Sequence, residues 1–139
     1  VATGLVCGKE MVVYECYFGW PEMKELYQRS CEPCGLGAPV VTQEEANSLS
    51  LSVPGWKREF HDGVEKLVRE FHFIEFRDAF SFTYKVASLA ERGDHHPTIK
   101  TEWGKVTIYW WTHQVSGLHV NDYIMAAKTD VVAKTSKPA

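Results

Sequence analysis

Asp62-Gly63 and the two stretches beside it constrain the fold of this chain more than any other feature. Asp-Gly is a preferred dipeptide for the two-residue type I′ turn, which needs positive φ at both positions. Residues 56–61 and 64–73 on either side have the alternation and the aromatic and β-branched side chains of paired strands. Pairing outward from the turn puts Glu59 opposite Lys66 as a cross-strand charge pair. The same pairing places on one face the side chains of Trp56, Phe60, Leu67, Phe71 and Phe73.

Residues 74–92 are predicted to form a long helix, because apolar side chains recur at helical spacing in two adjacent stripes. Such a broad apolar surface is expected to pack on a sheet and also to touch another helix or subunit. Gly93 is suited to follow the helix as its C′ residue. One stripe contains Phe76, Phe80, Thr83, Ala87 and Ala90, and the other contains Phe82, Val86 and Leu89.

Further elements complete the predicted order. Thr42 and Glu45 form a capping box for a helix that runs to about residue 49. A second hairpin is predicted over residues 98–103 and 105–113, and a last helix over residues 119–133. The order helix, two strands, helix, two strands, helix predicts an α+β fold. We expect a two-layer domain in which a four-stranded antiparallel sheet carries its helices on one face.

The predicted domain lies between two less structured ends. Residues 1–41 are expected to be an N-terminal extension and linker, with a short helix over residues 21–27. Residues 42–133 form the domain, and residues 134–139 form a polar tail. The first residue is Val, so organellar targeting of a longer precursor stays open.

Cysteine usage favours a reducing, cytoplasmic setting. All four cysteines lie in the first quarter of the chain, whereas a disulfide-dependent scaffold would distribute them through the fold. Their spacing fits no common zinc module, although the last two form a C-x-x-C pair. We therefore expect free thiols at Cys7, Cys16, Cys31 and Cys34.

The composition excludes several classes of protein. The 139 residues are 45% hydrophobic and 24% charged, as in an ordinary globular domain. A net charge of −3 argues against direct binding to nucleic acid, because proteins with that role usually carry a basic stripe. No apolar run approaches the roughly 20 residues that a membrane span needs.

The densest cluster of reactive side chains is residues 91–97, Glu-Arg-Gly-Asp-His-His-Pro. His95 and His96 can share a pocket only if the backbone turns there, and Pro97 with the preceding glycine favours a turn. Histidine gains and loses a proton near neutral pH, which suits acid–base catalysis. Two alternatives stay open on these residues alone. The histidines could be solvated in a surface turn, or they could bind zinc together with His113 and a carboxylate.

A strand over residues 105–113 would place four side chains on one face, those of Thr107, Tyr109, Trp111 and His113. Tryptophans are numerous around this strand. Trp103, Trp110 and Trp111 are expected in the core or at an interface rather than against a ligand.

A longer pattern extends the cluster. It reads Glu91-x-x-Asp94-His95-His96-Pro97, then Trp103-x-x-Val106, Thr112-His113 and Gly117-Leu118-x-x-x-Asp122. This pattern resembles the signature of pterin-4a-carbinolamine dehydratases, and residues 102–107 and 110–113 look most like bacterial members. The resemblance covers about residues 31–133. His119 departs from it, since the family usually has Ser or Thr there, and this predicts a weaker N-cap for the last helix.

The resemblance implies an enzyme of tetrahydrobiopterin recycling, which dehydrates 4a-hydroxytetrahydrobiopterin to a quinonoid dihydropterin and water. It implies that His95, His96 and His113 are catalytic, with no metal and no cofactor. It also implies a homodimer or homotetramer and a functional link to an aromatic amino acid hydroxylase. The residues expected to bind the pterin are Glu91, Asp94, Pro97, Thr112, Gln114 and Asp122.

The alternative function on the same fold is a binding role without catalysis. Some proteins that resemble this family act as a dimerisation cofactor for a homeodomain transcription factor, or as assembly factors for another enzyme. Retention of all three histidines favours the enzyme, since a scaffold has no chemical need for them.

Overall fold

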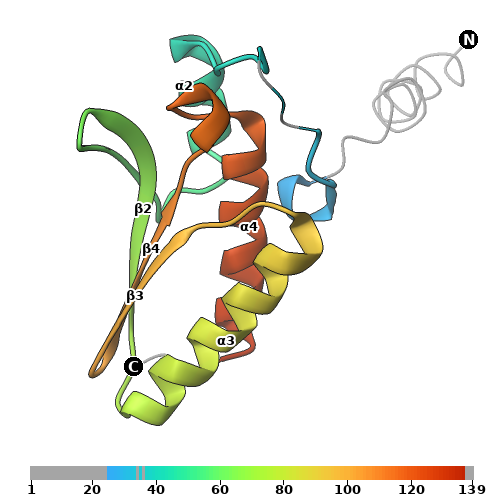
Figure 1. The fold of residues 1–139 in the computed structure, drawn as a ribbon. Helices are drawn as coiled ribbons and strands as arrows, with labels where there is room; N and C mark the ends of the chain where they lie inside the picture. Colours follow the sequence, from blue (N-terminus) through green and yellow to red (C-terminus); the bar gives the residue numbers. More distant parts are fainter. Residues whose placement is uncertain (1–24, 34, 36, 137–139) are drawn as a thin grey trace, which may run out of the picture.

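The computed structural model describes residues 25–33, 35 and 37–136. Its four strands form one antiparallel sheet in the order β1-β2-β4-β3. Three α-helices accompany the sheet, and α3 and α4 lie side by side against one of its faces (Figure 1). The α+β prediction is therefore confirmed. The strands are β1 (Lys57–His61), β2 (Val64–His72), β3 (Thr98–Glu102) and β4 (Lys105–Trp110), and the helices are α2 (Gln43–Ser50), α3 (Phe76–Gly93) and α4 (Val120–Lys134).

The first hairpin has the expected turn and register. Asp62 and Gly63 both have positive φ, at 53° and 76°, and Glu59 is the register partner of Lys66. The predicted core face is buried except for Phe60, which is 74% exposed. The prediction for Phe60 is wrong because this residue lies next to the turn, whereas α3 and α4 cover the sheet at β2, β3 and β4.

Helix α3 buries one of its two predicted stripes and exposes part of the other. Phe82, Val86 and Leu89 belong to the core. Phe76 and Phe80 are exposed, with their ring centroids 6.3 Å apart. An aromatic surface is thus left uncovered along the helix within the described chain.

The end of α3 differs from the prediction at one residue. Gly93 is the last helical residue, and Asp94 takes the left-handed conformation instead, with φ 47° and ψ 40°. Asp94 donates its backbone N–H to the carbonyls of Ala90 and Glu91. Gly93 packs closely on α4, since a Cβ there would lie 3.0 Å from the sulfur of Met125. The chain therefore turns immediately before the two adjacent histidines.

Strand β4 ends at Trp110, three residues earlier than predicted. Thr112 and Gly117 form an isolated bridge in which each backbone N–H donates to the other residue's carbonyl, at 2.9 and 3.4 Å. His113 begins the 3-10 turn η2 (His113–Val115) inside this closed loop. The loop fixes the backbone at His113 without extending the sheet.

His119 forms a complete N-cap for α4, contrary to the expected weaker cap. Its Nδ1 accepts from the backbone N–H of Asn121 at 3.1 Å. The carboxylate of Asp122 accepts from the backbone N–H of His119 at 2.8 Å. A buried imidazole thus replaces the hydroxyl that usually caps a helix.

The N-terminal segment is hydrogen-bonded to the domain. The side-chain amide of Asn121 accepts from the backbone N–H of Glu32 at 2.8 Å and donates to its carbonyl at 2.7 Å. Leu26 is buried within the 3-10 turn η1 (Leu26–Gln28), which packs on α4. The helix predicted over residues 21–27 begins outside the described residues. Cys7, Cys16 and Cys34 also lie outside them. In the described part of the chain, no helix has the length and apolar character to cross a membrane.

Candidate active site

A small cavity of about 110 Å³ lies where the end of α3, the end of β4 and η2 come together. It gathers residues that are up to 20 positions apart in the sequence, from Asp94 to Gln114. Five of its six lining residues belong to the set predicted from the sequence, and Trp111 is the addition. The lining residues are Asp94, His95, His96, Trp111, His113 and Gln114.

His95 is the buried histidine of this cavity, and it is tied to a buried carboxylate. Its Nε2 lies 2.6 Å from Oδ1 of Asp122 on α4. An ionised carboxylate only accepts hydrogen bonds, so Nε2 donates and Nδ1 is left to accept a proton. The imidazole also stacks on the indole of Trp110, with centroids 5.6 Å apart and planes 9° apart. Both contacts hold the ring in one orientation.

Asp122 and Thr112 are fully buried and are satisfied by protein groups. Oδ2 of Asp122 accepts from the hydroxyl of Thr112 at 2.9 Å and from the backbone N–H of His119 at 2.8 Å. Three donors including His95 therefore converge on one carboxylate. This network orients His95, and neither Thr112 nor Asp122 lines the cavity itself.

His96 and Glu91 form the exposed counterpart of the buried pair. Nε2 of His96 lies 2.9 Å from Oε1 of Glu91, and both side chains are open to solvent. Together with Pro97 they line a neighbouring apolar groove of about 320 Å³ that runs along α3. His96 lines both hollows and so stands between them.

His113 is exposed and stacks on Trp111, with ring centroids 4.4 Å apart and planes 20° apart. Nζ of Lys66, on β2, lies 3.9 Å from the centroid of the Trp111 ring. Trp111 was expected in the core or at an interface, and it instead lines the cavity. The available signal was the two-residue spacing that puts Trp111 and His113 on the same face.

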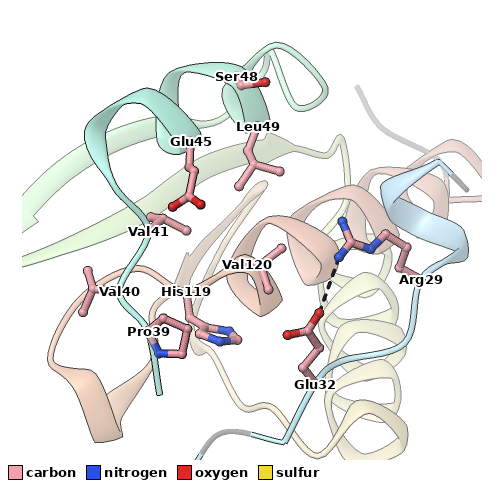
Figure 2. A pocket seen from close by; sticks show the side chains of 10 residues that line it. All are labelled: Arg29, Glu32, Pro39, Val40, Val41, Glu45, Ser48, Leu49, His119 and Val120. Atoms are coloured by element: carbon pink, nitrogen blue, oxygen red, sulfur yellow. Dashed lines mark ion pairs between the residues drawn. The ribbon is translucent and has the colours of Figure 1, made fainter. Parts of the chain in front are cut away.

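A larger cavity of about 430 Å³ lies between the N-terminal segment, α2 and the start of α4. Figure 2 shows Pro39 and Val40 on one side of it and the Arg29–Glu32 ion pair on the other, with 3.6 Å between the charged atoms. Glu45 also lines it, but that carboxylate accepts from the backbone N–H of Thr42 at 2.8 Å as part of the helix cap. Its lining includes none of the residues predicted for the site.

Comparison with known proteins shows which family the chain belongs to. A family model described as Pterin 4 alpha carbinolamine dehydratase matches residues 39–132. The chain belongs to this family. The match spans all of the sequence pattern from Glu91 to Asp122, and so contains the whole candidate site.

Relatives within the pterin-4a-carbinolamine dehydratase family are similar along most of the chain. A "Putative pterin-4-alpha-carbinolamine dehydratase" from Syntrophotalea carbinolica is 47% identical over 110 residues, which are 79% of this chain and 98% of the relative. A protein of the same name from Marinobacter nauticus is 52% identical over 108 residues, which are 78% of this chain and 97% of the relative.

A solved structure of the family has the same fold. It is described as a transcriptional coactivator/pterin dehydratase from Brucella melitensis, and it aligns with a TM-score of 0.62 at 33% identity. The alignment covers 68% of this chain and 99% of the other. The dehydratase fold therefore accounts for the domain that carries the histidines.

Proposed function

We propose that this chain catalyses the dehydration of 4a-hydroxytetrahydrobiopterin to quinonoid dihydrobiopterin and water. The observation that carries the proposal is the pairing of buried His95 with Asp122 beside a cavity that His113 also lines. Family membership supports the substrate class, since the relatives are named for the pterin carbinolamine. The substrate would come from an aromatic amino acid hydroxylase, whose reaction leaves a hydroxyl on the pterin ring.

The reaction needs one proton delivered and one removed. The bond between C4a and its hydroxyl breaks, the departing oxygen takes a proton and leaves as water, and a ring nitrogen loses its proton. We assign His95 and His113 as the acid–base pair, because two imidazoles can carry both transfers near neutral pH. His95 would act through Nδ1, since Nε2 is engaged by Asp122. His96 and Glu91 would position the pterin at the exposed side of the cavity.

The test is the rate of dehydration of freshly prepared 4a-hydroxytetrahydropterin, followed by ultraviolet absorbance. We expect wild type to exceed the spontaneous rate. His95→Ala and His113→Ala should each lose on the order of 100-fold of the enhancement, and His96→Ala less. His72→Ala is the matched control, because His72 lies on β2 and pairs with Glu70 away from the cavity. A well-folded wild type with only the spontaneous rate would instead support the binding role without catalysis.

We also propose that the exposed face of α3 packs against a second copy in a homodimer or homotetramer. Phe76, Phe80 and Tyr84 stand on this face, and the latter two are 59% and 70% exposed. Aromatic side chains in a row on one helix are unusual on the surface of a monomer and common at interfaces. Sedimentation of Phe80→Glu against wild type tests this, with dissociation to monomers as the expected result and an unchanged mass as the contrary one.

A further inference from the structure

Three side chains form a stack at the edge of the cavity: one from β2, one from the residue that follows β4 and one from η2. The register pairs Leu67 of β2 with Trp110 of β4, so the next position along the antiparallel ladder sets Lys66 beside Trp111. Nζ of Lys66 lies 3.9 Å from the indole centroid, and the indole stacks on His113 at 4.4 Å. We call these three residues, Lys66, Trp111 and His113, the Lys66 stack.

Lys66 does not make the charge pair expected from the sequence. Its register partner Glu59 lies instead 2.9 Å from Nε2 of His61. Among the described residues, no ion pair involves Lys66, and its ammonium lies over the indole. A cation over the face of an indole is attracted by the quadrupole of the ring. Lys66 therefore restricts the orientation of Trp111.

His113 needs such support more than His95 does. His95 is buried and is held by both Asp122 and Trp110. The His113 side chain is exposed and extends from a short 3-10 turn. Among the described residues its ring makes no hydrogen bond, and it stacks on the face of Trp111. An exposed imidazole without a partner would distribute among rotamers, and catalysis needs a single one.

We propose that Trp111 and Lys66 are positioning residues for the dehydration: Trp111 holds the His113 imidazole at the cavity, and Lys66 holds Trp111. This inference rests on the proposed function for its catalytic consequence, because His113 must take part in proton transfer for its orientation to affect the rate. The stack itself is independent of that function and can be observed without substrate.

The first experiment observes the stack in solution by NMR of the His113 ring protons. An indole face shifts the resonances of a ring stacked on it upfield. We expect this upfield shift in wild type, its loss in Trp111→Leu and its retention in Trp111→Phe. Trp103→Leu is the matched control, since Trp103 is 79% exposed in the β3–β4 turn and does not line the cavity. An unshifted His113 ring in wild type would overturn the stack.

The second experiment measures kcat and KM for dehydration in the same variants. Trp111→Leu should lower kcat roughly tenfold with little change in KM, and Trp111→Phe should restore most of it. Lys66→Met keeps the aliphatic stem and should lower kcat about two- to fivefold. Lys57→Met, an exposed lysine of β1, is its control.

The outcomes separate the two proposals. A raised KM at unchanged kcat in Trp111→Leu would overturn positioning, because the indole would then bind the pterin directly. Loss of the ring shift with no change in kcat or KM would also overturn it while the proposed function stands. If His113→Ala itself left the rate unchanged, the assignment of His113 in the proposed function would fail, whatever the NMR spectrum of the stack.

Discussion

Helix α4 carries a fully buried carboxylate, Asp122, and a partly buried one, Asp130, which differ in what surrounds them. Asp122 lies in its first turn, and Asp130 follows eight residues later, about 12 Å along the axis. Asp122 accepts from a histidine, a threonine hydroxyl and a backbone N–H. Asp130 accepts at one oxygen from Nε1 of Trp56 at 2.8 Å and from Nη1 of Arg69 at 2.7 Å.

The partners decide what each carboxylate can do. A histidine held by a carboxylate keeps a second nitrogen that can accept a proton, whereas the indole and guanidinium beside Asp130 keep their protons. Burial raises the pKa of Asp130, and the donors Trp56 and Arg69 oppose that rise without cancelling it. Asp130 therefore joins α4 to the first hairpin, while Asp122 serves the candidate site.

The difference between the two carboxylates is tested most strongly by Asp122→Asn and Asp130→Asn. We expect Asp122→Asn to lower the dehydration rate by at least roughly 100-fold, because His95 loses the carboxylate that orients it. The same change should lower the free energy of unfolding by about 2–4 kcal/mol, since an amide meets three donors in a buried site. Asp130→Asn should leave the rate unchanged.

The dehydration rate and the free energy of unfolding in urea are measured for both variants. If Asp122→Asn proves too unstable to assay, Thr112→Val removes a single donor to the same carboxylate and is the milder test. Equal rates in the two asparagine variants would mean that the difference between the carboxylates is structural and not functional.

A smaller effect is expected from Gly55→Ala, which acts on Asp130 through its partner. A Cβ at residue 55 would lie 2.5 Å from Nη1 of Arg69, so the guanidinium that donates to Asp130 must shift. We expect a loss of about 1–2 kcal/mol in the free energy of unfolding, with no change in dehydration rate. Gly35→Ala is the matched control, because an added Cβ there meets nothing within 4 Å. Equal unfolding curves for the two alanine variants would show that Arg69 adapts without cost.

The smallest expected effect is on the pH dependence of stability. The folded state raises the pKa of Asp130, so it binds this proton more tightly than the unfolded chain does. The resulting stabilisation is fully present below the ordinary Asp pKa of about 4 and is lost as pH rises through the raised value. The free energy of unfolding of wild type minus that of Asp130→Asn should therefore fall as pH rises through this window. A difference that rises with pH would contradict the assignment.

Local sequence was sufficient to predict the elements. Asp62-Gly63 specified its turn because positive φ at two successive positions is a property of the residues themselves. The capping box of Thr42 and Glu45 likewise formed as expected. The exposure of Phe60 could not be predicted in the same way. The alternation of side chains along a strand shows which face a residue is on, but not how far the helices cover that face.

The candidate site could likewise be predicted only in part. The residue types and their order could be predicted from the sequence: the adjacent histidines after a helix, a third histidine after a strand and the acidic residue of the last helix. Packing of the helices on the sheet brings Asp122 to His95, 27 residues away, and Asp130 to Trp56 and Arg69, and the sequence gives no sign of these contacts. The tertiary structure also places Lys66 and Trp111 against His113. The physical reason is that turns and helix caps depend on neighbours within a few residues, whereas these pairings depend on how the helices and the sheet pack together.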